Sequence, residues 1–510
     1  MELSKKMKTP TFLTFYDVSK AYDHANNDDM LSIVWERGLR GKSWRILKAF
    51  CNDLHASVKT RFGPSRDFQM EIGGRQGSRI TGRLFSKMMD VLSEELQQTT
   101  LGFNFHETLR IPVLLWVDDV LSFAVGEEEQ DEILQKVDEF AIKHKLQWGQ
   151  AKCNVMRVGL HKKNDKRTWN LGTMQIEEAT TYKYLGDHIS NDGKYTKNIE
   201  ARKIKTQATT VNINSMASTE ILRQIETSVL LELHEKVTIP GLLANAESWS
   251  LLKTESTQME KIEYQALRNM FDLSLHTPIP ALVFTFGTMF THLRIEKQRL
   301  MYLHRILNRQ NTHWTYQVFK ILEEQNLGWA KTIKKTLRTL DLPTDLAIIK
   351  DQRPNEWKKL VHEKIEIKNK ARLIDDCHKM VDGKKVRKTK TSFLVDIISA
   401  DTYSRKPSPE LQNLTKQETK TAIISRYGML ECGTNFKNSN NIQCQVCKIR
   451  DNEDHRLNHC IRFRTTNNFD HDEKVNFNDV YSTDTLVLKK VIKRIENVWN
   501  TRNAHGSMVQ

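Results

Sequence analysis

The sequence predicts an α+β chain in three parts, with a sheet near its N-terminus, helices in the middle and a small module at its C-terminus. Up to about residue 189, apolar strand-like runs alternate with helix-like segments, as expected where helices pack on a sheet. From residue 191 to about residue 390, proline is scarce and apolar residues recur at helical period. After a linker-like stretch at residues 404–409 comes a group of cysteine and histidine residues. The predicted domains are residues 1–190, 191–400 and 401–510.

The first part opens with an apolar, aromatic strand over residues 11–18, near whose end lies Asp17. Helix-like spacing over residues 30–50, interrupted by a glycine-containing break at residues 38–41, predicts two paired helices. Alternation over residues 57–72 predicts a β-hairpin that turns at residues 63–65. A glycine-punctuated loop and a helix over about residues 84–97 follow.

Two further apolar runs, residues 111–117 and 120–125, are separated only by Asp118 and Asp119. This pattern predicts a buried hairpin with carboxylates at its tip. Residues 127–146 carry apolar residues on one helical face, which predicts a helix packed across the preceding sheet.

Charge and composition indicate a partner rich in phosphate. The chain has 78 Lys and Arg against 63 Asp and Glu, a net charge of +15. Such a surplus favours nucleic acid, because cationic side chains release counterions from a phosphate backbone. The alternative is that the lysines only keep the protein in solution.

The length of the apolar segments and the distribution of cysteines predict where the protein is located. No run of 18 apolar residues appears, so membrane insertion is not expected, and the N-terminal apolar segment is too short for a signal peptide. Seven scattered cysteines suit a reducing compartment. We therefore expect an intracellular protein of the nucleus or cytoplasm that is not secreted.

Three carboxylates are the first candidates for catalysis. Synthesis of a phosphodiester needs two divalent ions held between carboxylates from separate strands. Asp17 at a strand end could converge with Asp118 and Asp119 at a hairpin tip, and hard oxygen ligands suit Mg²⁺. The alternative for an isolated Asp-Asp pair is a solvated turn.

The order of several segments resembles the reverse transcriptases of non-LTR (LINE-type) retrotransposons. Polymerase motifs A, B and C are resembled by residues 15–23 (FYDVSKAYD), 73–77 (GGRQG) and 116–119 (WVDD). Motif D and the primer-gripping hairpin are resembled by residues 146–153 (LQWGQAKC) and 182–186 (YKYLG). The resemblance implies a right-hand polymerase palm followed by an α-helical, thumb-like region.

The resemblance also implies a role for each matching residue. Asp17, Asp118 and Asp119 would bind Mg²⁺ or Mn²⁺, with the Val18 carbonyl facing a metal, and Lys152 would assist the pyrophosphate leaving group. Tyr22 would be a steric gate against the 2′-hydroxyl of rNTPs, although ordinary core packing is the alternative for its ring. The residues implied to bind substrate are Val18, Tyr22, Gly74, Arg75, Gln76 and Gly77, and those of the primer grip are Tyr184, Leu185 and Gly186.

The chain departs from the family pattern at several positions. Trp116-Val117 replaces an aromatic residue followed by Ala, Thr81-Gly82 replaces Ser-Pro, and Gly149 replaces a common Asn. A larger ring at position 116 predicts crowding of the site and reduced activity. Because the chain begins close to motif A, we expect the fingers and an endonuclease domain to be absent.

A zinc knuckle is predicted near the C-terminus. Cys444, Cys447, His455 and Cys460 have the spacing C-x2-C-x7-H-x4-C, which suits tetrahedral Zn²⁺, and His459 is a competing ligand. The alternative is that these cysteines are buried free thiols. A similar knuckle follows the polymerase in many non-LTR elements, where its expected task is contact with nucleic acid.

Two functions follow from these patterns. The first is an RNA-directed DNA polymerase that adds dNTPs to a DNA primer at a nicked target, copying the element's RNA. The second is a catalytically inactive, retrotransposon-derived protein that binds RNA or single strands. The sequence leaves the oligomeric state open.

Overall fold

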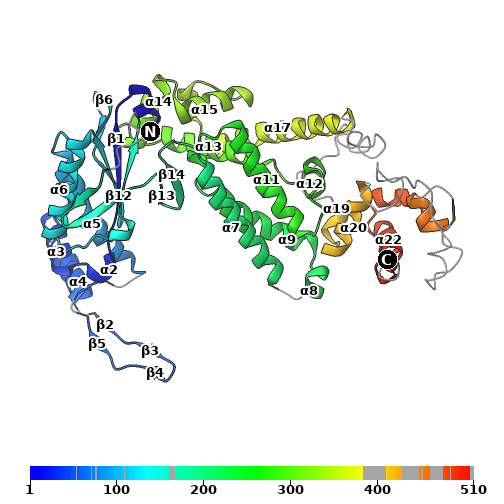
Figure 1. Ribbon diagram of the computed structural model, residues 1–510, viewed down its shortest axis with the longest axis horizontal. Coiled ribbons are helices and arrows are strands. Elements are labelled where there is room, and N and C mark those ends of the chain that lie inside the picture. Colours follow the sequence, from blue (N-terminus) through cyan, green and yellow to red (C-terminus); the bar gives the residue numbers. More distant parts are fainter. Residues whose placement is uncertain are drawn as a thin grey trace. The chain divides into compact units, whose positions relative to one another are not determined.

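The computed structural model describes residues 1–52, 54–70, 72–74, 77–107, 109–159, 167–216, 219–382, 409–427, 447–448, 452–459, 475–482 and 484–505. The chain divides into two compact units (Figure 1). Unit 1 comprises Met1–Asn198 and Gln310–Lys331, and unit 2 comprises Ile199–Arg309 and Thr332–Gln510. The predicted three-domain division stays a prediction.

A mixed sheet forms the centre of unit 1. Within the described residues it has six strands in the order β11-β12-β10-β1-β9-β8. Their bounds are β1 (Thr11–Asp17), β8 (Val113–Trp116), β9 (Asp119–Val125), β10 (Asn154–Val158), β11 (Trp169–Leu171) and β12 (Met174–Glu178). The central strand β1 pairs antiparallel with β9 and with β10. Covered on both faces, β1 is buried along nearly its whole length, which explains its unbroken apolar sequence.

The alternation of side chains along β1 divides the core of unit 1 between two faces. Phe12 and Tyr16 belong to the core cluster that the helices α3 (Asn27–Glu36), α5 (Arg79–Gln97) and α6 (Glu127–Lys143) complete. Between them, Thr14 accepts a hydrogen bond of 2.7 Å from Gln130 of α6. The predicted helix over residues 127–146 and its packing on the sheet are confirmed.

The opposite face of β1 carries a second hairpin, β13 (Thr181–Tyr184) and β14 (Asp187–Ser190). The Tyr182 ring stacks on Phe15 with ring centroids 4.1 Å apart and an interplanar angle of 13°. The two turn residues, Leu185 and Gly186, both have positive φ, of 47° and 86°. Glycine adopts this conformation easily, whereas Leu185 is held in it by the tight turn.

Between β1 and α5 the chain forms two helices and a hairpin. The predicted pair of helices is confirmed as α3 and α4 (Gly41–Asn52). The predicted hairpin is confirmed too, as β2 (His55–Ala56), β3 (Lys59–Thr60), β4 (Gly63–Pro64) and β5 (Phe68–Gln69), but its turn lies at residues 61–62 and not at 63–65, because Thr60 pairs with Gly63. Helix α5 begins at Arg79, earlier than predicted, where the Ser78 hydroxyl accepts a hydrogen bond from the Ile80 amide.

The other elements of unit 1 complete its edges. They are α1 (Glu2–Met7), α2 (Ala21–His24), β6 (Phe103–His106), β7 (Leu109–Ile111), η1 (Gln150–Lys152) and α14 (Trp314–Glu324). Ile321 of α14 packs with Leu109 and Ile111. The helices α7 (Thr196–Ser215) and α15 (Gly328–Thr339) each pass from one unit into the other.

Unit 2 is helical in its described part, which confirms the helical period predicted from residue 191 as far as residue 382. Its elements are α8 (Thr219–Gln224), α9 (Thr227–Leu233), η2 (His234–Thr238), α10 (Ile239–Leu243), η3 (Ala246–Ser248), α11 (Lys253–Met270), α12 (Ile279–Phe286), α13 (Thr291–Leu307), α16 (Leu346–Asp351), α17 (Pro354–Asp382), α19 (Pro409–Gln412), α20 (Lys416–Arg426), η4 (His455–His459), η5 (Phe477–Tyr481) and α22 (Thr485–His505). Among the described residues, no helix is long and apolar enough to cross a membrane.

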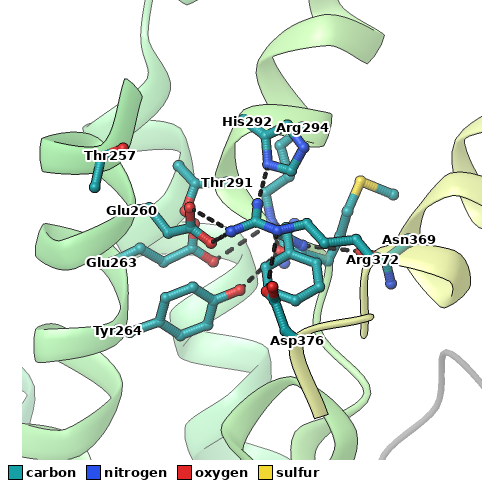
Figure 2. A network of polar contacts seen from close by, with 12 residues as sticks. Thr257, Glu260, Glu263, Tyr264, Thr291, His292, Arg294, Asn369, Arg372 and Asp376 are labelled. Atoms are coloured by element: carbon teal, nitrogen blue, oxygen red, sulfur yellow. Dashed lines mark hydrogen bonds and ion pairs between the residues drawn. The ribbon is translucent and has the colours of Figure 1, made fainter. Parts of the chain in front are cut away.

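A polar network joins α11, α13 and α17 within unit 2 (Figure 2). The Arg372 guanidinium donates two hydrogen bonds to the Glu260 carboxylate, at 2.8 and 3.0 Å, and lies 3.9 Å from the centroid of the Phe290 ring. It also donates to His292 Nδ1, because burial and the charges of Arg372 and Lys368 lower the pKa of His292 to about 3 and keep its ring neutral. Pairing of the partly exposed Arg372 with the buried Glu260 carboxylate links α17 to α11, and the contact with His292 links α17 to α13.

Candidate active site

The pairing of β1 with β9 brings the predicted aspartates together. Asp17 ends β1 and Asp119 begins β9, and the two residues are direct register partners in the antiparallel ladder. Cross-strand partners of this kind have Cβ atoms about 5 Å apart. Asp118 lies in the turn between β8 and β9, next to Asp119. Asp17 and Asp119, which are 102 positions apart in the sequence, therefore meet at one end of the sheet.

The turn that carries Asp118 is strained. Trp116 pairs with Asp119, which leaves Val117 and Asp118 as the two turn residues. Val117 has a φ of 58°, a conformation that costs a β-branched residue about 1–2 kcal/mol. Trp116 is 65% exposed, so its side chain does not pack into the interior of unit 1, and the reduced activity expected from its larger ring stays a prediction.

The carboxylates influence one another electrostatically. Burial, and then the charges of Asp118 and Asp17, raise the pKa of Asp119, whereas the charge of Lys152 lowers it. Burial and the charge of Asp118 also raise the pKa of Tyr22. The end of the sheet thus concentrates negative charge, which a cation would relieve.

A cation from the chain itself lies at this end. Lys152 Nζ donates hydrogen bonds to both oxygens of the Asp17 carboxylate, at 3.1 and 3.3 Å. The Lys152 side chain is 68% exposed, so it can leave Asp17 at small cost. Its backbone is fixed more firmly, because the Tyr182 hydroxyl donates to the Lys152 carbonyl at 2.7 Å.

The segment before Lys152 is aligned against β1 by backbone contacts. The Ser19 amide donates to the Gln147 carbonyl at 2.8 Å, and the Gly149 amide donates to the Asp17 carbonyl at 2.9 Å. A Cβ at Gly149 would lie 3.2 Å from Asp17 Oδ2. The glycine at this position, one of the departures from the family pattern, therefore leaves room for the Asp17 carboxylate.

These residues surround a cavity of about 500 Å³. It is lined by Asp17, Val18, Ser19, Lys20, Ala21, Tyr22, Asp118, Gly149, Gln150, Ala151 and Lys152. Two carboxylates and two lysines face one space, which suits a phosphate-bearing ligand bound with a cation. Ser19 and Lys20 were missed as candidates, although their position inside the motif A segment was a signal.

The glycine loop is fixed to the segment that carries Tyr22. The Gly74 amide donates to the Tyr22 carbonyl at 2.8 Å, and the Gly73 amide donates to the Ala25 carbonyl at 3.0 Å. A Cβ at Gly74 would lie 2.1 Å from the Thr81 methyl carbon, so only glycine fits. Gly77 has a positive φ and does not line the cavity, and Arg75 and Gln76 lie outside the described residues.

Tyr22 lies between the cavity and the helical core. Its ring is tilted against Phe85 with centroids 5.9 Å apart, and a Cβ at Gly82 would lie 3.5 Å from its hydroxyl oxygen. The ring is therefore packed on one side and lines the cavity on the other. Asn27, which was missed, donates to the Gly73 carbonyl in the adjoining loop, and nothing in its local sequence indicates that role.

The predicted primer-grip residues lie on the β13–β14 hairpin and not in the cavity. Tyr184 packs against Phe15, with centroids 5.7 Å apart. Burial and the charge of Asp119 raise the pKa of Tyr184 to about 12. The hairpin therefore comes close to the carboxylates, while Leu185 and Gly186 form its turn.

The fit of metal ions differs between the two predicted centres. Among the described residues, no group of three or more His, Cys, Asp and Glu side chains is arranged to hold a metal ion. The aspartates are hard oxygen donors whose negative charges lie close together, which suits Mg²⁺ or Mn²⁺. Their side chains are not arranged as a complete set of metal ligands. Of the predicted zinc ligands, Cys447 is half-buried and His455 is buried in η4. Cys444 and Cys460 lie outside the described residues, so the zinc knuckle stays a prediction.

A known protein family matches only the first part of the chain. Residues 1–189 match the family described as "Reverse transcriptase (RNA-dependent DNA polymerase)". No curated protein matches the chain. Among solved structures, telomerase from Candida tropicalis in complex with a TWJ fragment of telomeric RNA aligns with a TM-score of 0.31 and 13% identity over 78% of this chain and 50% of that chain. The corresponding complex of telomerase from Candida albicans aligns with a TM-score of 0.30 and 12% identity over 78% and 51%.

The family match agrees with the geometry that unit 1 shows. The chain spans about half the length of the two telomerase chains. The predicted α+β class, with a palm-like first part followed by helices, is confirmed at that level. The Asp17 and Asp118-Asp119 segments both lie inside the matched region. Residues 1–189 therefore match a reverse transcriptase domain, and this resemblance supports RNA-directed DNA polymerase chemistry for that part of the chain.

Proposed function

We propose that this chain is the polymerase of a non-LTR retrotransposon, which adds dNTPs to a DNA primer on an RNA template. The observation that supports it most strongly is the pairing of Asp17 with Asp119 across β1 and β9, with Asp118 in the adjoining turn. An accidental Asp-Asp turn would not need a third carboxylate opposite it. The retrotransposon origin rests on the order of the five motif-like segments.

Asp17, Asp118 and Asp119 would hold the divalent ions, with the Val18 carbonyl as a further ligand. Bound Mg²⁺ or Mn²⁺ would activate the primer hydroxyl and neutralise the triphosphate. To hold a metal ion, Asp17 would have to give up its contact with Lys152. The exposed Lys152 ammonium could then donate a proton to the leaving pyrophosphate or offset its negative charge.

Tyr22 would select the sugar of the incoming nucleotide. Its ring lines the cavity and is braced by Phe85 from behind, so it cannot retreat from an added 2′-hydroxyl. Gly74 would support the new base pair through the loop bonded to the Tyr22 carbonyl, with Arg75, Gln76 and Gly77 beside it. Tyr184, Leu185 and Gly186 would hold the primer end.

Primer extension tests the proposal. The full chain is incubated with a DNA primer on an RNA template and dNTPs, in Mg²⁺ and in Mn²⁺, beside Asp118→Asn and the control Asp90→Asn. Asp90 lies on the surface of α5, where it pairs with Lys87 at 2.7 Å. Extension by wild type and the control, with loss in Asp118→Asn, supports the enzyme. Equal extension by all three proteins would refute the role of the carboxylates.

The second candidate is an inactive protein that binds RNA or single strands. The net charge of +15 and the absence of a ready-made metal cage among the described residues favour it. If no protein extends the primer while wild type and Asp118→Asn bind RNA equally, this candidate is supported. Intracellular location, in the nucleus or cytoplasm, is proposed for either function.

The zinc knuckle would serve either function as a contact to nucleic acid. Cys444, Cys447, His455 and Cys460 are the proposed ligands. Metal analysis of purified protein should give one zinc per chain, lost in Cys447→Ser and kept in the control Cys51→Ser. Equal zinc in both variants would contradict the ligand set.

A further inference from the structure

The hairpin of residues 55–69, here called the arm, stands away from the sheet and helices of unit 1 (Figure 1). In it β2 pairs with β5 and β3 pairs with β4. Its apolar side chains are exposed, with Val58 at 55%, Phe62 at 87% and Phe68 at 49%. A two-stranded hairpin is marginally stable alone, and exposed apolar groups on it indicate a binding surface.

The chemistry of the arm indicates what binds there. Phe62 lies in the turn at its tip, with the Arg61 guanidinium 4.8 Å from the ring centroid. Lys59 and Arg66 add positive charge, and within residues 55–69 only Asp67 opposes it. An exposed aromatic ring with one cation beside it, on an arm with further cations, fits an unpaired nucleic acid strand, whose bases can stack on the ring while its phosphates meet the cations. A duplex keeps its bases inside and cannot use the ring in this way.

The base of the arm is fixed beside the candidate active site. The Met70 amide donates to the Leu54 carbonyl at 2.7 Å and closes the hairpin. Just outside it, the buried Asn27 side chain donates to the Cys51 carbonyl at 3.1 Å and to the Gly73 carbonyl at 3.0 Å. The next residue, Gly74, is bonded to the Tyr22 carbonyl. The arm thus starts and ends next to the residue that lines the cavity, and its tip lies roughly 25 Å away along the strands.

We propose that the arm binds the unpaired stretch of the template ahead of the position being copied, with Phe62 stacked on a base and Lys59, Arg61 and Arg66 on phosphates. This inference rests on the proposed function, because a polymerase leaves its template unpaired on the incoming side of the active site. The arm would then guide the template toward Tyr22 and add affinity for any sequence, since every base offers a face for stacking.

Binding of two hybrids to the full chain tests the arm. One is a DNA primer on an RNA template with a long unpaired 5′ overhang, and the other is the same hybrid with blunt ends. By fluorescence anisotropy, Phe62→Ala should weaken binding of the overhang hybrid by roughly tenfold and leave blunt binding unchanged. Phe62→Trp, which keeps an aromatic ring, should bind the overhang hybrid as tightly as wild type does. Joint replacement of Lys59, Arg61 and Arg66 by Ala should lower the salt dependence, as a log–log slope, by about 2.

The matched control is Ile142→Ala, which truncates another largely exposed apolar residue, on α6 (Ile142 is 70% exposed and Phe62 is 87% exposed). Thermal denaturation confirms that the variants stay folded. The inference would be overturned if Phe62→Ala bound the overhang hybrid as tightly as wild type does. An equal loss of affinity for the blunt hybrid would also overturn it. So would a variant that loses self-association but still binds RNA. If the arm variants lose overhang binding while wild type extends no primer, the binding surface stands and the proposed polymerase fails.

Discussion

Gly73 ties the glycine loop to the segment that carries Tyr22, and its replacement by alanine is predicted to loosen both. Its φ of 91° costs an L-residue about 1–2 kcal/mol. The new Cβ would lie 2.8 Å from the Asp23 carbonyl oxygen and 3.0 Å from that of Tyr22, and neither backbone atom can swing aside. Displacing the loop also strains the hydrogen bonds from Gly73 to Ala25 and from Gly74 to Tyr22, each worth about 1 kcal/mol. The total cost is roughly 2–4 kcal/mol.

Gly82→Ala is the matched control for this prediction. Gly82 lies within α5, where a Cβ would meet only the Tyr22 hydroxyl, at an ordinary 3.5 Å. Alanine is the better helix former, so this variant should gain up to about 1 kcal/mol. Thermal denaturation followed by circular dichroism should show unit 1 melting roughly 4–16 °C lower in Gly73→Ala. Amide exchange of peptides from α2 and α5 should rise. A melting temperature unchanged in Gly73→Ala, or lowered equally in Gly82→Ala, would refute the reasoning.

Three further predictions concern single side chains. Tyr22→Ala should lower the preference for dNTPs over rNTPs by at least tenfold in primer extension, because the ring braced by Phe85 no longer meets the 2′-hydroxyl, and an unchanged preference would count against a steric gate. Lys152→Met removes the charge that lowers the pKa of Asp119. The Asp119 carboxylate should then protonate at higher pH, so the acidic limb of the pH–activity profile moves upward, while the control Lys136→Met leaves it in place. Arg372→Met leaves the buried Glu260 carboxylate without its bidentate partner and removes the ring contact with Phe290, so unit 2 should lose roughly 2–4 kcal/mol in urea denaturation. A loss below 0.5 kcal/mol in Arg372→Met, on the order of a surface substitution, would show the network to be dispensable.

Helical period, strand alternation and the Asp-Asp pair were enough to predict several individual elements of unit 1. The helix over residues 127–146 and the hairpin around Asp118 were found because each has a local apolar pattern that matches its burial. The turn of the arm was predicted at residues 63–65 because Gly and Pro usually mark turns, yet Thr60 pairs with Gly63. In an exposed hairpin nothing in the core fixes the register, so the turn residues alone mislead.

Other features had no signal in the local sequence. The local sequence did not indicate that Trp116 is largely exposed. Asn27 clamps both ends of the arm, and Lys152 contacts Asp17, through neighbours far away in the chain. In the sequence, Phe62 is indistinguishable from an apolar core residue. The structure shows that it is 87% exposed.

By itself the sequence predicted the class of the fold, the three candidate carboxylates and a polyanionic partner, because residue type, period and charge are local properties of the chain. Only the tertiary structure decided that Asp17 faces Asp119, that Tyr22 is packed on one side and open on the other, and that the arm projects from the site. These depend on strand register and on contacts between distant segments. Such contacts are set by how the whole sheet and its helices pack together, which no single stretch of residues encodes.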